Sequence, residues 1–253
     1  MDLGLQERVF VVTGGSRGLG RATAEVLVAE GAHVVLSARD PEQLSATVAS
    51  LGGPERALGV PTDLTDVGAE ERLIAAAVAR FGRVDGALLS CGGPPAGTVL
   101  ETTDDVWRSS FESVFLGPLR TARALASTMH DGGALAFVLS SSVHEPIPGL
   151  AVSNGLRPGI AGVVKDLADE MAPRAVRVNG LLPGRINTDR TRELDARAGR
   201  GDSARRRRES AIPAGRYGDP IEFGTIAAFV LSAAASYLTG AMIPIDGGAR
   251  RSI

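Results

Sequence analysis

A glycine-rich turn constrains the fold of this chain more than any other feature. Residues 13–20 (TGGSRGLG) lie between a β-branched apolar run and an Ala-rich amphipathic stretch. Gly14 permits a sharp turn from strand to helix, while Gly18 and Gly20 allow a pyrophosphate to approach the backbone and the helix to pack on the sheet. The spacing alone is weak, but its position between strand and helix favours a dinucleotide site over a plain turn. The predicted contacts here are Thr13, Gly14, Ser16, Arg17, Gly18, Leu19 and Gly20.

Short apolar runs alternate with helical patterns along the whole chain, as in βαβ units with a parallel sheet. Most runs are apolar on both faces, which is typical of strands covered by helices on both sides. The stretches 19–31 and 70–82 are amphipathic and end at glycine, as helices do. Because no repeat or linker interrupts this pattern, we expect one α/β domain over residues 1–253. It should be Rossmann-like and doubly wound, with a seven-stranded parallel sheet and helices on both faces. The predicted strands are 8–14, 33–38, 57–64, 86–92, 134–141, 175–182 and 241–248.

Residues 189–212 differ from the rest of the chain, because they are polar and rich in arginine and lack a clear apolar face. We interpret this segment as a mobile, variable insertion. Its run of four arginines, 205–208, either contacts an anionic ligand or is a solvated charge run, and the second interpretation is favoured.

Composition excludes several classes of protein. A net charge of −2 over 253 residues gives no electrostatic basis for binding nucleic acid. The single Cys91 rules out an internal disulfide and fits a reducing compartment. No apolar stretch reaches about 18 residues, and the N-terminus lacks the features of a secretion signal. We therefore expect a cytoplasmic protein without a membrane span, a nucleic-acid partner or a metal site.

The end of the second predicted strand, with the sequence LSARD, bears on the choice of cofactor. A carboxylate there usually holds the ribose 2′-hydroxyl of NAD, whereas the 2′-phosphate of NADP needs positive charge. Ser37, Arg39 and, from the glycine-rich turn, Arg17 supply a hydroxyl and two guanidiniums, which suit a phosphate. Asp40 instead fits the cap of a helix that begins with proline. NADP(H) is therefore favoured over NAD(H).

Together these features resemble the short-chain dehydrogenase/reductase family over nearly the whole chain. The family's T-G-x-x-x-G-x-G turn matches residues 13–20, its Asp-Leu pair residues 63–64, and its Pro-Gly element after the sixth strand residues 182–188 (LPGRINT). Its last strand and turn match residues 239–248. The resemblance implies an enzyme for a small carbonyl or alcohol substrate, assembled as a homodimer or homotetramer. It also implies cofactor contacts at Asp63, Leu64, Cys91, Gly92, Gly93, Pro183, Gly184, Ile186 and Thr188.

The resemblance further implies a catalytic tetrad of an Asn, a Ser and a Tyr-x-x-x-Lys pair, and most of it is replaced in this chain. We aligned the predicted helix 153–173 by its G-x-x-K-x-L-A segment. Ser153 then stands at the Tyr position and Arg157 at the Lys position. Ser140 stands at the Ser position and Val114 at the Asn position. One member of the tetrad is therefore retained.

Misalignment does not explain the missing pair. The chain has two tyrosines, Tyr217 and Tyr237, and one lysine, Lys165, so no alignment yields a Tyr-x-x-x-Lys pair. Lys165 lies about two helical turns beyond Arg157 and is interpreted as a surface residue. The Ser-Asn-x-x-Arg pattern resembles a divergent branch of the family that is grouped with the β-ketoacyl-carrier-protein reductases. That resemblance favours an altered site over a decayed one.

The residues at the replaced positions can still contribute to catalysis. Arg157 lies four residues after Ser153 on one helix face, and its guanidinium can hold the nicotinamide ribose but cannot exchange protons near neutrality. Ser153 either relays a proton through water or is a remnant without a proton role. His144 or Glu145 can supply the acid instead, although a loop histidine that faces solvent is the favoured interpretation. Ser140 is expected to polarise the carbonyl.

Three functions are compatible with this pattern. The favoured one is an NADP(H)-dependent oxidoreductase, similar to a 3-oxoacyl reductase, that interconverts a carbonyl and an alcohol. The second is a pseudoenzyme that binds NADP and acts as a sensor or an assembly partner. The third is a non-redox reaction such as dehydration or epimerisation. The arginines of residues 189–212 give a weak indication of an anionic substrate group.

Overall fold

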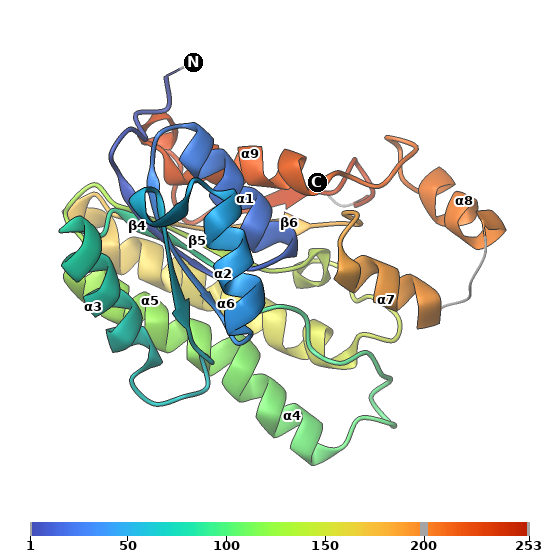
Figure 1. Cartoon of the computed structure of the whole chain (residues 1–253). Helices are drawn as coiled ribbons and strands as arrows, with labels where there is room; N and C mark the ends of the chain where they lie inside the picture. The colour runs from blue at the N-terminus through green and yellow to red at the C-terminus, as the bar shows by residue number, and fades with distance from the viewer. Residues whose placement is uncertain (1, 198–201, 252–253) are drawn as a thin grey trace.

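In the part of the chain that the structure describes, seven short strands form one parallel sheet in the order β3-β2-β1-β4-β5-β6-β7 (Figure 1). The computed structural model describes residues 2–197 and 202–251. The strands are β1 (Val9–Thr13), β2 (His33–Ala38), β3 (Ala57–Pro61), β4 (Gly86–Leu89), β5 (Ala134–Val138), β6 (Arg177–Pro183) and β7 (Met242–Ile245). Each strand overlaps its predicted run, so the predicted sheet is confirmed.

The first strand shows why these runs become central strands. Val9 and Val11 belong to the core on one face of the sheet, while Phe10 and Val12 belong to the core on the other. All four side chains are at most 2% exposed. Because successive side chains of a strand point to opposite faces, a run that is apolar at every position must be covered on both sides.

Two layers of helices provide this cover (Figure 1). On one face lie α1 (Gly18–Ala29), α2 (Pro41–Ser50) and α9 (Pro220–Leu231). On the other face lie α3 (Ala69–Phe81), α5 (Gly117–Thr128) and α6 (Ala151–Met171). A further helix, α4 (Asp104–Ser110), leads into α5 through a π-helical turn, Phe111–Leu116. None of the described helices combines the length and the apolarity that a bilayer span requires. The doubly wound, Rossmann-like domain is confirmed.

Two predicted roles at helix positions are also confirmed. The Asp40 carboxylate accepts hydrogen bonds from the backbone N–H groups of Glu42 and Gln43, each at 3.0 Å, and so caps the first turn of α2. Lys165 is exposed on α6 and its ammonium group lies 2.8 Å from the carboxylate of Asp169. Lys165 is therefore a surface residue and takes no part in the site.

Residues 189–212, for which the sequence predicts no helix, contain two helices that lie beyond the carboxyl ends of the strands (Figure 1). They are α7 (Asp189–Arg197) and α8 (Asp202–Ser210), and residues 198–201 lie outside the described residues. Ion pairs along the helix surfaces support them, since Arg192 lies 2.5 Å from Asp189 and Arg205 lies 2.8 Å from Glu209. These pairs stabilise helices that lack a wide apolar face. We call residues 189–212 the lid.

The carboxylate of Asp195 joins the lid to the body of the domain. It accepts hydrogen bonds from the Tyr217 hydroxyl at 2.8 Å and from the Arg185 guanidinium at 2.7 Å. The Arg208 guanidinium of α8 lies 3.5 Å away. Burial and the hydrogen bond to Asp195 raise the pKa of Tyr217, which keeps its hydroxyl a donor. Asp195 therefore connects α7, α8 and the loop that precedes α9.

Candidate active site

A cleft of 1560 Å³ opens at the carboxyl ends of the strands, beside the neighbouring strands β1 and β4. The chain leaves these two strands toward opposite faces of the sheet, and such a switch point is the usual ligand site of open α/β sheets. The structure brings most of the predicted cofactor residues to this cleft. They are Gly14, Ser16, Arg17, Gly18, Leu19, Ser37, Arg39, Asp63, Leu64, Cys91, Gly92, Gly93, Arg157, Pro183, Gly184, Ile186 and Thr188.

The two other predicted cofactor residues, Thr13 and Gly20, lie behind the cleft and shape it. The Thr13 hydroxyl donates to the backbone carbonyl of Ser90 at 2.9 Å and accepts from its N–H at 2.8 Å, which ties β1 to the loop after β4. A Cβ on Gly20 would lie 2.4 Å from the carbonyl oxygen of Gly14. These residues position the glycine-rich turn and do not line the cleft.

The glycine-rich turn fits the pyrophosphate of a dinucleotide. Gly14 has a φ of +60°, in the left-handed region that favours glycine, so the chain turns sharply from β1 into α1. The N-cap residue of α1, Arg17, makes no side-chain capping bond, which leaves the N–H groups of the first turn for an anion. Gly18 has a φ of +57°, also in the left-handed region, and lies beside the Thr188 methyl of the Pro-Gly element.

Polar groups gather at the end of the cleft formed by β2 and β3. Ser37 is buried at the end of β2. Arg39, two residues after it, and Arg17, in the glycine-rich turn, are both exposed. The Thr65 backbone N–H holds the pKa of Asp63 below its usual value, with smaller contributions from the Thr65 hydroxyl and the charge of Arg39. Asp63 is therefore ionised at neutral pH, and the two guanidiniums give this end of the cleft its positive charge.

Three serines have separate roles near the start of α6. Ser140 lines the cleft, and its hydroxyl oxygen accepts a hydrogen bond from the Ser142 N–H at 3.1 Å. Ser142 is buried, and its hydroxyl lies 3.1 Å from the hydroxyl of Ser153. Ser153 itself is 6% exposed and lines the cleft. The structure thus brings Ser140 and Ser153 to one wall, with Ser142 behind them.

Arg157 is buried one turn further along α6 and is 5% exposed. Its Nη1 donates to the Val138 carbonyl at 2.6 Å, and its Nη2 donates to the Gly92 carbonyl at 2.7 Å. Its Nε has no hydrogen-bond partner among the described residues. Arg157 therefore joins the end of β5 to the loop after β4 at the edge of the cleft, a structural contact that the sequence does not predict.

The loop before α6 carries both candidate proton donors, and only one of them lines the cleft. The Asn154 side chain fixes this loop through two hydrogen bonds of 2.9 Å, to the N–H and the carbonyl of Ile147. Glu145 lines the cleft. His144 is exposed and lies outside the cleft lining, so the structure does not bring it together with Ser140 and Ser153.

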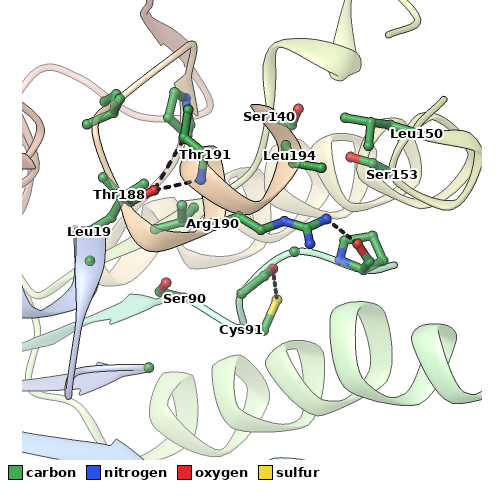
Figure 2. A pocket seen from close by; sticks show the side chains of 18 of the residues that line it. Leu19, Ser90, Cys91, Ser140, Leu150, Ser153, Thr188, Arg190, Thr191 and Leu194 are labelled. Atoms are coloured by element: carbon green, nitrogen blue, oxygen red, sulfur yellow. Dashed lines mark hydrogen bonds between the residues drawn. The ribbon is translucent and has the colours of Figure 1, made fainter. Parts of the chain in front are cut away.

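The lid contributes residues that sequence reasoning missed. Figure 2 shows Arg190 and Leu194 on the side of α7 that faces Ser140 and Ser153. The Arg190 guanidinium crosses to the loop after β4 and donates to the Pro94 carbonyl. The sequence analysis singled out this segment only as a whole, through its arginine content, and named neither residue as part of the site.

The position expected for the tetrad Asn also has an unexpected backbone. Val114 is 2% exposed and lies within the π-helical turn between α4 and α5. The neighbouring Ser110 and Ser113 line the cleft as well. The Cys91 thiol lies 3.8 Å from the Val114 carbonyl. No side chain here carries the carboxamide that the family pattern implies.

The fold and the cleft define a Rossmann-type α/β protein with an open cleft at the switch point of its sheet. The family model described as enoyl-(acyl carrier protein) reductase matches residues 14–250. The chain belongs to the short-chain dehydrogenase/reductase family of oxidoreductases.

Two curated relatives show the extent of the similarity. The pig protein dehydrogenase/reductase SDR family member 4 is 33% identical over 251 residues, which cover 96% of this chain and 88% of the relative. The 3-oxoacyl-[acyl-carrier-protein] reductase FabG of Vibrio harveyi is 31% identical over 248 residues, which cover 97% and 98%. Both alignments span nearly the whole domain, so the family assignment does not depend on the glycine-rich turn alone.

Two solved structures are similar over their full length. L-sorbose reductase from Gluconobacter frateurii, in complex with NADPH and L-sorbose, has a TM-score of 0.93 at 27% identity, with all of both chains covered. A short-chain oxidoreductase from Pseudomonas aeruginosa PAO1, described as containing an atypical catalytic centre, has a TM-score of 0.89 at 30% identity and the same coverage.

Proposed function

We propose that the protein is an NADP(H)-dependent oxidoreductase, similar to a 3-oxoacyl reductase, that interconverts a carbonyl and an alcohol at an atypical site. The observation that carries this proposal is the meeting of the glycine-rich cradle with Ser140 and Ser153 in one cleft. The bound nicotinamide would supply or accept the hydride. The relatives named for 3-oxoacyl and sorbose reduction support a carbonyl substrate.

In this proposal the chain's own residues hold the carbonyl and the cofactor. Ser140 polarises the carbonyl with its hydroxyl, which lines the cleft. Arg157 supplies the positive charge of the replaced lysine, and two of its five N–H groups already bind Val138 and Gly92. The remaining hydrogens of its two Nη atoms would bind the nicotinamide ribose. The Pseudomonas structure with an atypical catalytic centre supports a family member whose site is altered.

The proton is proposed to pass through Ser153 and water. The burial of Ser153 and its contact with Ser142 favour a retained, ordered hydroxyl over an unused remnant. The exposed place of His144 counts against it as the donor, whereas Glu145 lines the cleft. A serine lacks a pKa near neutrality, so we expect slow turnover compared with a tyrosine-bearing site.

We include location and assembly in the proposal, the first from the single cysteine of the chain and the second from the family resemblance. The protein is proposed to be cytoplasmic and to form a homodimer or homotetramer. Exposed apolar side chains support assembly, since Phe111 is 39% exposed beside α5 and Tyr237 is fully exposed near β7.

A turnover screen with purified protein tests the function. NADPH oxidation is followed with β-ketoacyl thioesters, quinones and simple ketones. We expect Ser140→Ala to lower kcat by about 10²–10³-fold, because one donor to the developing oxyanion is lost, and Ser153→Ala by about 10²-fold. Ser127→Ala, on the exposed surface of α5, serves as the control.

Three results would contradict the proposal in different ways. Undiminished turnover of the Ser140 and Ser153 variants would refute their roles. Tight NADPH binding without turnover of any carbonyl would favour the pseudoenzyme. A product with an unchanged oxidation state, identified by mass spectrometry, would favour a non-redox reaction.

The preference for NADP is tested at Arg39. We expect Arg39→Ala to raise the Kd for NADPH by about 10-fold or more, since a charge-assisted contact to the 2′-phosphate is lost. The Kd for NADH should stay within about 2-fold, because NADH has no such phosphate. Fluorescence titration measures both constants, with Arg80→Ala on α3 as the control. Equal weakening for both cofactors would contradict the preference.

A further inference from the structure

Ser142 lies behind the two serines that line the cleft, Ser140 and Ser153 (Figure 2). Ser142 is 3% exposed and is not part of the cleft lining. Its backbone N–H donates to the Ser140 hydroxyl oxygen at 3.1 Å, and its own hydroxyl lies 3.1 Å from the Ser153 hydroxyl. One buried residue therefore contacts both hydroxyls that the proposed reaction uses.

The hydroxyl of Ser142 has a different kind of partner from other buried hydroxyls of the domain. Those of Thr23 and Thr121 donate to backbone carbonyls four residues earlier in the chain, each at 2.9 Å. Such a bond satisfies a hydroxyl within its own helix. Ser142 lies instead in the 3₁₀ turn Ser141–Val143 after β5, and its partner Ser153 is in the first turn of α6. The Ser142 hydroxyl thus joins two elements where the second one brings Ser153 to the cleft.

The acceptors around Ser142 determine where the two protons can point. The backbone carbonyl of Ser153 lies 3.4 Å from the Ser142 hydroxyl and can only accept, whereas the Ser153 hydroxyl oxygen is closer, at 3.1 Å. If Ser142 donates to that oxygen, the Ser153 proton is left to point into the cleft. If Ser153 donated to Ser142 instead, its proton would point away from the cleft. Only the first arrangement allows Ser153 to give a proton toward the carbonyl.

We propose that Ser142 is a positioning residue, whose hydroxyl donates to Ser153 and directs the Ser153 proton into the cleft. This inference rests on the proposed function, since it concerns the proton route of the same site. Negative charge develops on the Ser153 oxygen as its proton leaves, and a hydrogen bond to a charged oxygen is stronger than one to a neutral oxygen. The contribution of Ser142 therefore grows toward the transition state and affects kcat more than KM.

The first test measures turnover of a carbonyl from the screen described above. Ser142→Ala removes the hydroxyl and keeps the backbone N–H that binds Ser140, so it isolates the contact with Ser153. We expect kcat to fall by about 10-fold and KM to stay within about 2-fold, because one hydrogen bond of the transition state is lost. Ser142→Cys keeps a weak donor of similar size and should recover part of kcat.

A double substitution separates positioning from general structural support. In Ser153→Ala, the further change Ser142→Ala should alter kcat by less than about 2-fold, because there is no longer a hydroxyl to position. Ser232→Ala is the control for loss of a buried hydroxyl. Ser232 is 1% exposed, donates to the Phe229 carbonyl at 2.7 Å and lies outside the cleft lining, so its loss should lower stability and leave kcat unchanged.

A structural test needs no turnover and so separates this inference from the proposed function. In crystals grown with NADP+, we expect the Ser153 side chain to occupy one rotamer in the unsubstituted protein and at least two in Ser142→Ala. A single, unchanged rotamer in Ser142→Ala would overturn the inference, as would an equal fall in kcat with and without the Ser153 hydroxyl. If the rotamer changes while the unsubstituted protein reduces no carbonyl, the redox function fails and the positioning of Ser153 stands.

Discussion

Substitution of Gly20 by alanine is expected to weaken NADPH binding severely. The added Cβ would lie 2.4 Å from the Gly14 carbonyl oxygen and 2.9 Å from its carbon, and neither backbone atom can move without displacing the turn. Overpacking of this kind costs about 1–3 kcal/mol of unfolding free energy. Because the turn is proposed to form the pyrophosphate cradle, we expect the Kd for NADPH to rise by at least about 100-fold. Fluorescence titration and urea unfolding measure the two effects.

A second glycine provides the control. Gly162 is an exposed helical residue of α6, and a Cβ added there meets no atom within 4 Å. Gly162→Ala should leave the Kd unchanged and raise stability by about 0.5–1 kcal/mol, because glycine is unfavourable inside a helix. NADPH binding by Gly20→Ala at the affinity of the unsubstituted protein would show that the turn does not hold the cofactor.

Replacement of Arg157 by leucine is expected to affect both folding and cofactor binding. It leaves the Val138 and Gly92 carbonyls without their donors beside the cleft, which should lower the unfolding free energy by about 2–4 kcal/mol. It also removes the positive charge proposed for the nicotinamide ribose, so the Kd for NADPH should rise by about 10-fold or more. Arg157→Lys retains the charge and should recover part of the affinity.

Arg174 offers a matched control for the structural part of this effect. Its guanidinium also donates to two backbone carbonyls, those of Ala126 and Met129, but it does not line the cleft. Arg174→Leu should lower stability and leave NADPH affinity unchanged. If Arg157→Leu behaves in the same way, Arg157 only joins strand ends, and its proposed role toward the cofactor is wrong.

The sequence predicts well what depends on neighbouring residues. The sheet was predictable because each strand is a short apolar run. The turn of residues 13–20 was predictable because its left-handed backbone conformation favours glycine at particular positions. The cap at Asp40 needs only the backbone N–H groups two and three residues further on, in the first turn of α2. In each case the residues that determine the local structure lie within a few positions of it in the chain.

Features made by distant residues were not predictable in the same way. The acceptors of Arg157 lie 19 and 65 residues from it in the chain. The alignment identifies Ser140, but the support that Ser142 gives to Ser153 depends on how a loop packs against α6. The lid helices were missed because ion pairs, and not an apolar stripe, stabilise them.

The role of Asp195 has a consequence for how this protein can diversify. Asp195 fastens the lid and Arg190 also binds the body of the domain through the Pro94 carbonyl, whereas the apolar Leu194 lines the cleft. A substitution at Leu194 can therefore change which molecule is accepted while the contacts of Asp195 and Arg190 stay intact. The substrate preference can thus change through a substitution in the lid that keeps the contacts that hold the lid in place.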